Sequence, residues 1–326
     1  MHTLITGAAG FIGAGVAKEL LESGGKVLGI DNFNDYYDVN LKRTRVANLL
    51  KHDNFKFYEE DIRNCVALID LIKKYKVKKI VHLAAQAGVR YSLINPQAYI
   101  ENNIDGFFNV IEAAKATGIE KFVYASSSSV YGMIDGTKAI KESSEADRPE
   151  SLYAATKRSN ELLAHSYAKL YGLPCVALRY FTVYGPWGRP DMAIFGFTKR
   201  ILSNIPIEIF NNGEMLRDFT YIDDVAKATI AVLNKDTPTS MKSSVPSSVY
   251  NVGNNSPTKL LELITILEEE IGKAAIKEFL PMQAGDVINT WADNTALRLD
   301  FQVNIATDIR IGIRNFVSWY KAFYNV

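Results

Sequence analysis

The segment Thr6-Gly7-Ala8-Ala9-Gly10-Phe11-Ile12-Gly13 joins an apolar run at residues 2–6 to a segment of helical periodicity at residues 12–23. Its glycines lie three residues apart. Glycine between a strand and a helix permits a sharp turn and lets the backbone approach a pyrophosphate closely. The first amides of the helix can then donate to that pyrophosphate. The segment therefore predicts a dinucleotide-binding turn near the start of the chain.

Apolar runs and helical segments continue to alternate up to about residue 180. We expect strands at residues 26–30, 55–58, 79–83, 121–125 and 174–179, and helices at residues 65–75, 96–117 and 153–171. Strands separated by helices form right-handed crossovers, which build a parallel sheet with helices on both faces. The sequence therefore predicts an α/β fold, with a Rossmann-like doubly wound parallel sheet over residues 1–180.

The pattern changes after residue 180, where Gly185, Pro186, Gly188 and Pro190 indicate a loop. Beyond it we expect helices at residues 194–203, 223–234, 259–271 and 308–323, strands at residues 207–210 and 249–252, and an exposed loop at residues 236–248. This part does not repeat the first. It predicts a smaller C-terminal α/β lobe, residues 181–326, which binds the substrate at the carboxyl ends of the strands and returns some chain to the first domain.

The charge balance limits the partners. The 326 residues include 37 Lys and Arg and 36 Asp and Glu, a formal net charge of +1, so we expect neither nucleic acid nor a membrane as a partner. Without a membrane-spanning run or a signal peptide, a cytoplasmic location is expected. Cys65 and Cys175 lie in apolar stretches and are expected to be free core thiols. The four His and the scattered Cys show no metal-ligand spacing.

Residues that follow the predicted strands complete a cofactor site. Asp31 comes directly after the second strand, where a carboxylate accepts hydrogen bonds from both ribose hydroxyls and repels a 2′-phosphate. NAD is therefore favoured over NADP. Asp61 and Ile62 follow the third strand, where we expect the adenine. The small residues of Leu83-Ala84-Ala85 follow the fourth strand and let the backbone lie against the cofactor.

Tyr153 and Lys157 are four residues apart and share one face of a predicted helix. The ammonium of Lys157 and the nicotinamide cation would favour the Tyr153 phenolate, whose ordinary pKa is about 10. That phenolate could accept a proton from a substrate hydroxyl while a hydride leaves to the cofactor. Hydroxyls also gather in the run 126–129, at the carboxyl edge of the fifth strand. We expect Ser127 to polarise the same substrate oxygen, and the neighbouring serines to bind other substrate groups.

Together these residues resemble the extended short-chain dehydrogenase/reductase family over almost the whole chain. The motifs are Gly7-x-x-Gly10-x-x-Gly13, Asp31, Asp61-Ile62-Arg63, Leu83-Ala84-Ala85, Asn103, the serine run and Tyr153-x-x-x-Lys157. The resemblance implies that NAD is bound by Gly7, Gly10, Phe11, Ile12, Gly13, Asp31, Asn32, Asp61, Ile62, Leu83, Ala84, Ala85, Asn103, Tyr153, Lys157 and Tyr180. It also implies a homodimer, because members of the family usually pair through the helices equivalent to residues 96–117 and 153–171.

Within the family, the chain is similar to the nucleotide-sugar 4-epimerases. The segment at residues 217–225 matches the one whose arginine, here Arg217, holds the nucleotide diphosphate. Gly285-Asp286 matches the segment whose acid meets the uridine ribose. Residues 31–37, 86–90 and 179–192 look like the UDP-glucuronate 4-epimerases, in which Thr182 and Arg189 would face the sugar carboxylate. A guanidinium with hydroxyl donors beside it suits a carboxylate.

The resemblance therefore implies a UDP-uronate substrate and catalysis by Ser127, Tyr153 and Lys157. UDP-glucuronate and UDP-galacturonate would interconvert through a 4-keto intermediate with tightly bound NAD, to supply polysaccharide synthesis. The implied substrate-binding residues are Arg90, Ser127, Ser128, Ser129, Tyr153, Thr182, Arg189, Phe210, Arg217 and Asp286. Two alternatives stay open: a 4-epimerase of UDP-glucose, a UDP-N-acetylhexosamine or an N-acetylated uronate, and a non-catalytic NAD-binding protein. Sugar dehydratases and uronate decarboxylases are disfavoured, because they place a carboxylate where this chain has Ser128-Ser129.

Overall fold

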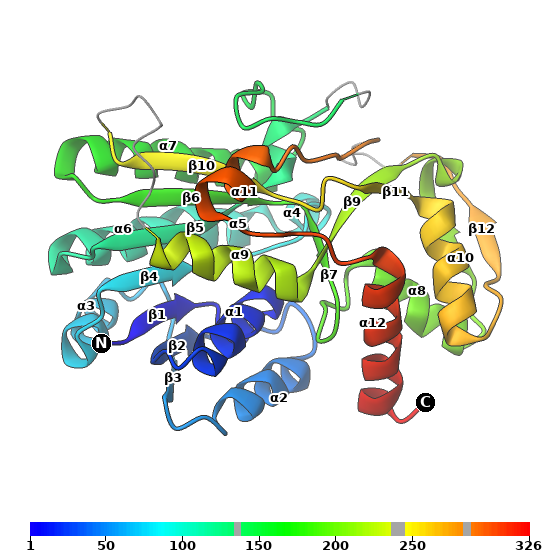
Figure 1. Cartoon of the computed structure of the whole chain (residues 1–326), viewed down its shortest axis with the longest axis horizontal. Coiled ribbons are helices and arrows are strands. Elements are labelled where there is room, and N and C mark those ends of the chain that lie inside the picture. Colours follow the sequence, from blue (N-terminus) through cyan, green and yellow to red (C-terminus); the bar gives the residue numbers. More distant parts are fainter. Residues whose placement is uncertain (134–137, 236–244, 283–287) are drawn as a thin grey trace.

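The computed structural model of the chain describes residues 1–133, 138–235, 245–282 and 288–326 (Figure 1). Its centre is a seven-stranded sheet with the strand order β10-β6-β5-β4-β1-β2-β3. All neighbouring strands in it run parallel. The strands are β1 (Thr3–Thr6), β2 (Val27–Asp31), β3 (Phe55–Glu59), β4 (Lys79–His82), β5 (Lys121–Ser127), β6 (Cys175–Tyr180) and β10 (Ser247–Val252). The predicted doubly wound α/β fold is confirmed.

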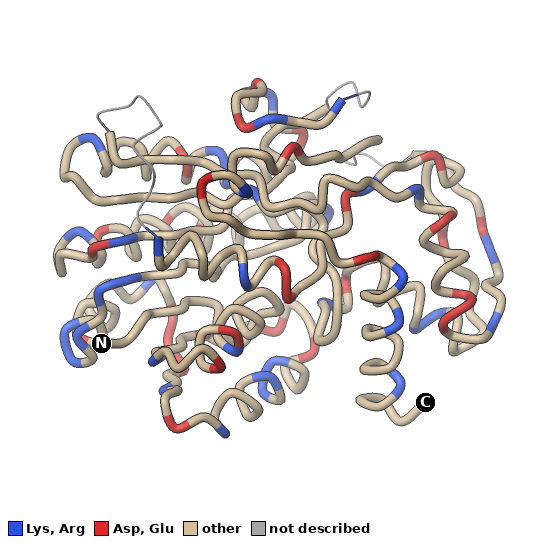
Figure 2. The backbone as a smooth tube through the Cα atoms, in the orientation of Figure 1, with Lys and Arg blue, Asp and Glu red and all other residues tan. Residues whose placement is uncertain are grey.

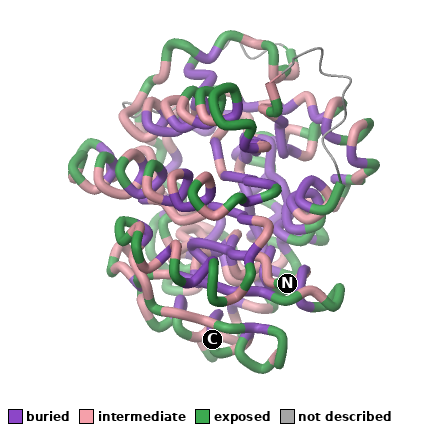
Figure 3. The backbone as a smooth tube through the Cα atoms, turned by 90° about the vertical axis from the view of Figure 1, so that its left-hand side faces the viewer, coloured by how far each residue is buried: buried purple, intermediate pink, exposed green. Residues whose placement is uncertain are grey.

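Helices cover both faces of this sheet (Figure 1). One layer holds α1 (Phe11–Glu22), α2 (Val39–Leu49) and α9 (Ile222–Asn234), and the other holds α3 (Cys65–Tyr75), α6 (Gly106–Thr117) and α7 (Leu152–Tyr171). Successive strand residues serve opposite layers, since Leu4 packs in the core under α3 and α6 whereas Ile5 packs under α1 and α9. Burial on both sides explains why the strands are continuous apolar runs, and Figure 3 shows the buried residues gathered in the interior.

The helix predicted at residues 96–117 is divided in the structure. It begins as α5 (Pro96–Tyr99), capped by the Asn95 side chain, which accepts from the Ala98 amide at 3.3 Å. A π-helical turn, η1 (Ile100–Asp105), follows before α6. Wider turns of this kind are frequent at functional sites, and this one contains the buried Asn103. A period of 3.6 residues does not reveal the wider turn, so the sequence predicted one continuous helix.

The strand β10 returns the chain to the main sheet, where it pairs with β6 at the edge. Residues 236–248 were predicted to be a loop, but Ser247 and Ser248 already belong to β10. The reason is that this edge strand starts with small polar residues, which carry no strand signal. Residues 236–244 of that predicted loop lie outside the described part of the chain.

The C-terminal lobe is built on two small sheets. In the first, β9 (Leu216–Tyr221) lies between β7 (Thr182–Tyr184) and β11 (Pro257–Lys259), and in the second β8 (Ile207–Ile209) pairs with β12 (Lys277–Phe279). Its helices are α8 (Ala193–Leu202), α10 (Leu260–Ile271) and α12 (Ile309–Tyr324), whereas α11 (Thr295–Phe301) packs on β10 and α9 of the main domain. Of the short strands, β8 was predicted, at residues 207–210, whereas β7, β9, β11, β12 and the helix α11 were not. Neither was α2, because two of its buried positions are the charged Lys42 and Arg45.

Basic and acidic residues are interspersed along the described chain (Figure 2). Within residues 1–133, 138–235, 245–282 and 288–326, no helix is long and apolar enough to cross a membrane. Cys175 is buried, as predicted, whereas Cys65 at the start of α3 is half-buried, and both are free thiols.

Candidate active site

The turn between β1 and α1 requires glycine for steric reasons. Gly7 has a φ of +72°, and a Cβ there would lie 2.7 Å from the Ala84 amide nitrogen in the loop after β4. A Cβ on Gly13 would collide with the Gly7 carbonyl oxygen. Gly10 is the N-cap of α1 and offers no side-chain acceptor to the first amides of the helix. These features make a cradle in which a pyrophosphate can meet the start of α1, as the sequence predicts.

Asp31 ends β2 beside this turn. Its carboxylate accepts from the Phe33 amide at 2.9 Å and from the Ala9 amide at 3.2 Å, one bond to each oxygen. Each oxygen keeps a further lone pair for a ribose hydroxyl. Burial raises the pKa of Asp31, and the neighbouring charge of Lys42 opposes that rise. The donor set of this cradle therefore fits the adenosine half of NAD.

We expect Asp31→Asn to weaken NAD binding by roughly 10-fold to 100-fold, since a charge-assisted hydrogen bond contributes about 1.5–3 kcal/mol. NADP should lose less, because the variant also removes the repulsion of its 2′-phosphate. Calorimetric titration of cofactor-free protein with both dinucleotides measures the ratio of their dissociation constants. An unchanged ratio would contradict the assignment of Asp31. Asp53→Asn, on an exposed turn before β3, is the control.

The loop after β4 is held by two residues that the sequence reasoning did not identify as functional. Thr6 Oγ1 accepts from the amides of Leu83 and Ala84, each at 3.2 Å. It lies 2.7 Å from Nδ1 of His82 and can donate its own proton there. Burial lowers the pKa of His82 to about 3, so the ring stays neutral and its Nδ1 can accept the hydrogen bond from the Thr6 hydroxyl. Thr6 and His82 thereby fix the backbone that lies against the cofactor.

Two predicted cofactor residues, Asn103 and Asp61, are not among the described residues that line the cleft. Asn103 is buried, accepts from the Gln86 amide at 2.8 Å, and donates to the Gln86 carbonyl oxygen and the Thr156 hydroxyl. All its amide groups are thus occupied by protein, and it positions the loop at residue 86. Asp61 accepts from Arg63 at 2.9 Å and from Asn32 at 3.1 Å. In this structure both residues therefore act on the site through protein partners, Asn103 on the loop at residue 86 and Asp61 on Asn32 and Arg63.

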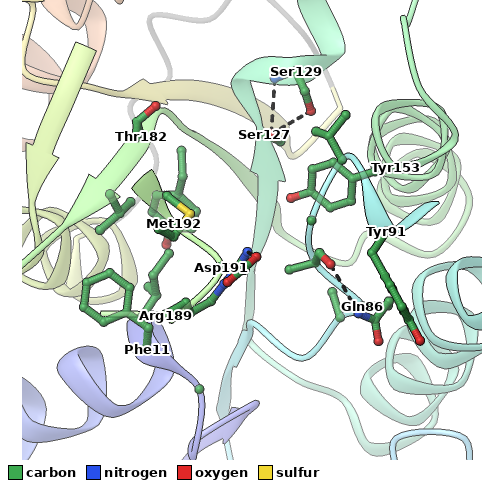
Figure 4. A pocket seen from close by; sticks show the side chains of 18 of the residues that line it. Phe11, Gln86, Tyr91, Ser127, Ser129, Tyr153, Thr182, Arg189, Asp191 and Met192 are labelled. Carbon is green, nitrogen blue, oxygen red and sulfur yellow. Dashed lines mark hydrogen bonds and ion pairs between the residues drawn. The ribbon is translucent and has the colours of Figure 1, made fainter. Parts of the chain in front are cut away.

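Tyr153 enters the cleft from the first turn of α7, whose N-cap Ser151 accepts from the Ala154 amide at 3.2 Å. The Tyr153 hydroxyl points into the open centre of the cleft, with Ser127 at the end of β5 close by (Figure 4). Lys157 lies one turn further along α7, and its Nζ donates to the Ala125 carbonyl oxygen at 3.0 Å. Serine, tyrosine and lysine are therefore brought together as predicted.

Burial raises the pKa of Tyr153 above its ordinary value. The charge of Arg189 and a hydrogen bond with Ser127 oppose that rise, and the charge of Asp191 adds to it. Lys157, which the sequence reasoning expected to lower this pKa, points instead to the Ala125 carbonyl oxygen. Burial also lowers the pKa of Lys157, to about 8. In this arrangement the cation that favours the phenolate is Arg189.

The run of serines divides between two environments. Ser127 accepts from the Ser129 hydroxyl at 2.8 Å, and these two line the cleft together with Ser128. The hydroxyl of Ser126 instead donates to Glu161 at 2.6 Å. Glu161 is also held by Arg179 of β6, at 2.7 and 2.8 Å, and both side chains are 3% exposed. A buried ion pair thus anchors the end of β5 behind the serines that face the cleft.

The cleft has a volume of about 860 Å³ and lies between the carboxyl ends of the strands and the C-terminal lobe. The predicted residues that line it are Gly7, Gly10, Phe11, Ile12, Gly13, Asp31, Asn32, Ile62, Leu83, Ala84, Ala85, Arg90, Ser127, Ser128, Ser129, Tyr153, Lys157, Tyr180, Thr182, Arg189, Phe210 and Arg217. The guanidinium of Arg90 lies 5.0 Å from the centre of the Phe210 ring. Asp286 lies outside the described residues.

Arg189 forms an ion pair that the sequence reasoning did not anticipate. Its Nε and Nη2 donate to the two carboxylate oxygens of Asp191, at 2.9 and 2.6 Å. The Tyr36 hydroxyl, from the loop after β2, donates to the same carboxylate at 3.1 Å. Tyr36 and Asp191 both belong to segments on which the family resemblance rests. They are 155 positions apart in the sequence, so the sequence alone does not indicate that they are in contact.

Fold and site together define a dinucleotide-dependent enzyme in which a tyrosine, a serine and a lysine face a cleft closed by a second lobe. The model of the NAD dependent epimerase/dehydratase family matches residues 3–253, and the chain belongs to that family. Its cofactor is NAD, for which the cradle at Gly7, Gly13 and Asp31 is suited.

Relatives match along nearly the whole chain. Protein CapI of Staphylococcus aureus is 45% identical over 334 residues, which are 99% of each protein. UDP-glucuronate 4-epimerase 4 of Arabidopsis thaliana is 45% identical over 333 residues, which cover 99% of this chain and 76% of that protein. The crystal structure of a UDP-glucuronic acid 4-epimerase from Bacillus cereus, in complex with UDP-glucuronic acid and NAD, is 37% identical. It superposes with a TM-score of 0.92 over 99% of this chain and 100% of that one.

Proposed function

We propose that this chain is a UDP-glucuronate 4-epimerase, which interconverts UDP-glucuronate and UDP-galacturonate. The observation on which the proposal rests is that Arg189 shares one cleft with Tyr153 and lies near enough to lower the pKa of its hydroxyl. A cation so close to a general base suits a sugar that carries a carboxylate next to the reacting carbon. The relatives named above support this substrate class. We infer that the product supplies the synthesis of uronate-containing polysaccharides.

In the proposed reaction Tyr153 accepts the proton of the sugar 4-hydroxyl, and Ser127 forms a hydrogen bond to the same oxygen. Bound NAD supplies reversible oxidation at the neighbouring carbon. When the sugar is reduced again on its opposite face, Tyr153 returns the proton to the oxygen. The chain thereby moves one proton back and forth at a single atom, and no cofactor is consumed.

Inversion requires the 4-keto sugar to turn over while the nucleotide stays bound. Arg217 of β9 lines the lobe side of the cleft and is fixed by a hydrogen bond from its Nη1 to the Ile288 carbonyl oxygen, at 2.8 Å. We assign to it the diphosphate, about which the sugar would rotate. The two parts of the chain would then divide the work. Residues 1–180 supply the cofactor site and the proton transfer, and the C-terminal lobe selects and anchors the nucleotide sugar.

A uronate substrate is open to a side reaction, because its 4-keto form is a β-keto acid that loses carbon dioxide readily. The loss requires the bond between C5 and the carboxylate to align with the carbonyl π system. We assign Arg189, Thr182 and the cleft-facing serines to hold the carboxylate out of that alignment. Thr182 of β7 and Ser128 line the same cleft, so both hydroxyls are available beside the guanidinium.

The substrate assignment is tested by comparing kcat/KM for UDP-glucuronate, UDP-glucose and UDP-N-acetylglucosamine with the protein as purified. We expect UDP-glucuronate to exceed both neutral sugars by at least about tenfold, the effect of one charge-assisted contact. Faster turnover of either neutral sugar would contradict the proposal and favour the corresponding 4-epimerase.

We further propose a homodimer through α6 and α7, which pack side by side in one layer. Phe108 of α6 and Leu162 and Leu170 of α7 are 46%, 58% and 68% exposed, a large apolar content for helices that would face water. Helices in this position form the usual dimer contact of the family that the sequence resembles.

Leu162→Arg is expected to convert the dimer into a monomer, because a buried guanidinium without a partner opposes association. Light scattering coupled to size exclusion measures the mass. Leu299→Arg is the matched control, since Leu299 is 74% exposed on α11, in the opposite layer of helices. Equal masses for the wild type and Leu162→Arg, whether monomeric or dimeric, would contradict this interface.

A further inference from the structure

The guanidinium of Arg189 has two edges that can form a fork of hydrogen bonds. The edge made by Nε and Nη2 is occupied by Asp191, at 2.9 and 2.6 Å. The edge made by Nη1 and the second proton of Nη2 has no hydrogen-bond partner within the part of the chain that the structure describes. Arg189 and Asp191 are 22% and 28% exposed, so the pair is accessible from the cleft that it lines.

Asp191 is itself held from the opposite side of the cleft. The Tyr36 hydroxyl donates to Asp191 at 3.1 Å, and the Tyr36 ring packs at 4.7 Å from that of Tyr91. Gly88 has a φ of +96°, and a Cβ at that position would collide with the Tyr36 hydroxyl. The absence of a side chain at Gly88 therefore makes room for Tyr36 beside Asp191.

The backbone that carries this ion pair is fixed by Arg45 of α2, which is 2% exposed. Its guanidinium donates to the carbonyl oxygens of Trp187 and Gly188, at 2.5 and 3.3 Å, and to that of Ala9 in the cofactor turn, at 2.9 Å. The loop at residues 187–191 is thus tied to the cofactor domain at both ends, by Arg45 and by Tyr36. A loop held in this way presents Arg189 in one orientation.

We propose that Asp191, held by Tyr36, is a positioning residue that fixes Arg189 so that its free Nη1/Nη2 edge receives the carboxylate of a uronate. This inference rests on the proposed function. The substrate would add to the unoccupied edge without displacing Asp191, because the two carboxylates use different edges of one guanidinium. Fork geometry of this kind is what distinguishes arginine from lysine in carboxylate recognition.

The arrangement also acts on the general base. Tyr153 faces Arg189 and Asp191 from the loop, Ser127 from β5 and Tyr99 from α5, while Lys157 of its own helix donates to the Ala125 carbonyl oxygen. Of these, Asp191 raises the pKa of Tyr153 and Arg189 lowers it, while burial raises it most. Loss of the Asp191 charge should therefore lower the pKa of Tyr153. Because turnover requires the phenolate, the acid limb of the pH profile should move to lower pH.

The test is a double-mutant cycle on the holoenzyme with Asp191→Asn, Arg189→Ala and the double variant. Calorimetry measures the dissociation constants of UDP-glucuronate and of UDP-glucose. We expect Asp191→Asn to weaken UDP-glucuronate binding by about tenfold, the effect of one lost charge-assisted contact, and UDP-glucose binding by less than about twofold. In the Arg189→Ala background the Asp191 substitution should have no further effect on either ligand. Asp53→Asn controls for the removal of one carboxylate.

Tighter binding of UDP-glucuronate by Asp191→Asn would overturn the proposal, since it would mean that Asp191 competes with the substrate. Equal losses for both ligands, additive losses in the double variant, or an acid limb that does not move would also overturn it, because each indicates a merely structural role. If the wild type epimerises UDP-glucuronate and any of these contradicting results is obtained, only the positioning role of Asp191 is wrong. If the wild type does not turn over UDP-glucuronate at all, it is the proposed function that fails.

Discussion

Tyr153→Phe is expected to lower kcat on UDP-glucuronate by about 10²-fold to 10⁴-fold, the usual contribution of a positioned general base. The substitution removes the only atom of this side chain that can accept a proton and leaves the packing of its ring intact. KM should stay within about threefold of the wild-type value, because the proposed binding contacts of the nucleotide lie on other residues such as Arg217.

The pH profile makes this prediction specific. Burial raises the pKa of Tyr153, so the phenolate fraction and the turnover of the wild type should increase as the pH rises toward that pKa. The residual turnover of Tyr153→Phe should lack this dependence. Tyr75→Phe is the matched control. The Tyr75 hydroxyl lies 2.6 Å from that of Tyr58, and the Tyr75 ring packs against His2, which precedes β1 at the edge of the sheet opposite to the cleft. A loss smaller than about tenfold would place the base elsewhere.

Arg189→Ala is expected to lower kcat/KM for UDP-glucuronate by about 100-fold, because the sugar carboxylate loses its bidentate cation. Turnover of UDP-glucose, if present, should change far less. With the carboxylate no longer held, decarboxylation of the 4-keto sugar should yield a UDP-pentose, which anion-exchange chromatography separates from the UDP-uronates. The acid limb of the pH profile should move to higher pH, since the charge that lowers the pKa of Tyr153 has gone.

Arg189→Lys separates the two roles of this side chain. It retains the positive charge, so the acid limb should stay near its wild-type position. It lacks the fork, so the affinity for UDP-glucuronate should stay low. If Arg189→Ala turned over UDP-glucuronate as fast as the wild type, without a UDP-pentose, the assignment of the sugar carboxylate to Arg189 would be wrong.

The sequence predicted the main sheet well, because strands buried on both faces appear as continuous apolar runs. It failed where burial and composition disagree. The helix α2 escaped prediction because Lys42 and Arg45 occupy buried positions. The strand β10 was predicted only from residue 249, because it begins with the small polar residues Ser247 and Ser248. In both cases tertiary contacts decide the structure. Arg45 can be buried because it donates hydrogen bonds to two loops, and the first residues of β10 form a strand because they pair with β6.

For the site, local motifs predicted the residues that face the cleft better than those that support them. Asn103 belongs to a motif, but a motif does not reveal whether an amide meets a ligand or the Gln86 backbone. Adjacent serines look equivalent in the sequence, yet the alternation of a strand directs Ser126 to Glu161 and Ser127 to the cleft. The pairing of Arg189 with Asp191 depends on the path of a loop, which no periodicity encodes.

The most direct test of the central claim is to incubate the purified protein, without added cofactor or reductant, with UDP-glucuronate in one vessel and UDP-galacturonate in another. Chromatography then resolves the UDP-sugars over time. We predict that both vessels approach the same mixture of the two UDP-uronates, with no UDP-pentose formed. A UDP-pentose as the main product, or no conversion in either vessel by protein that turns over UDP-glucose, would contradict the account.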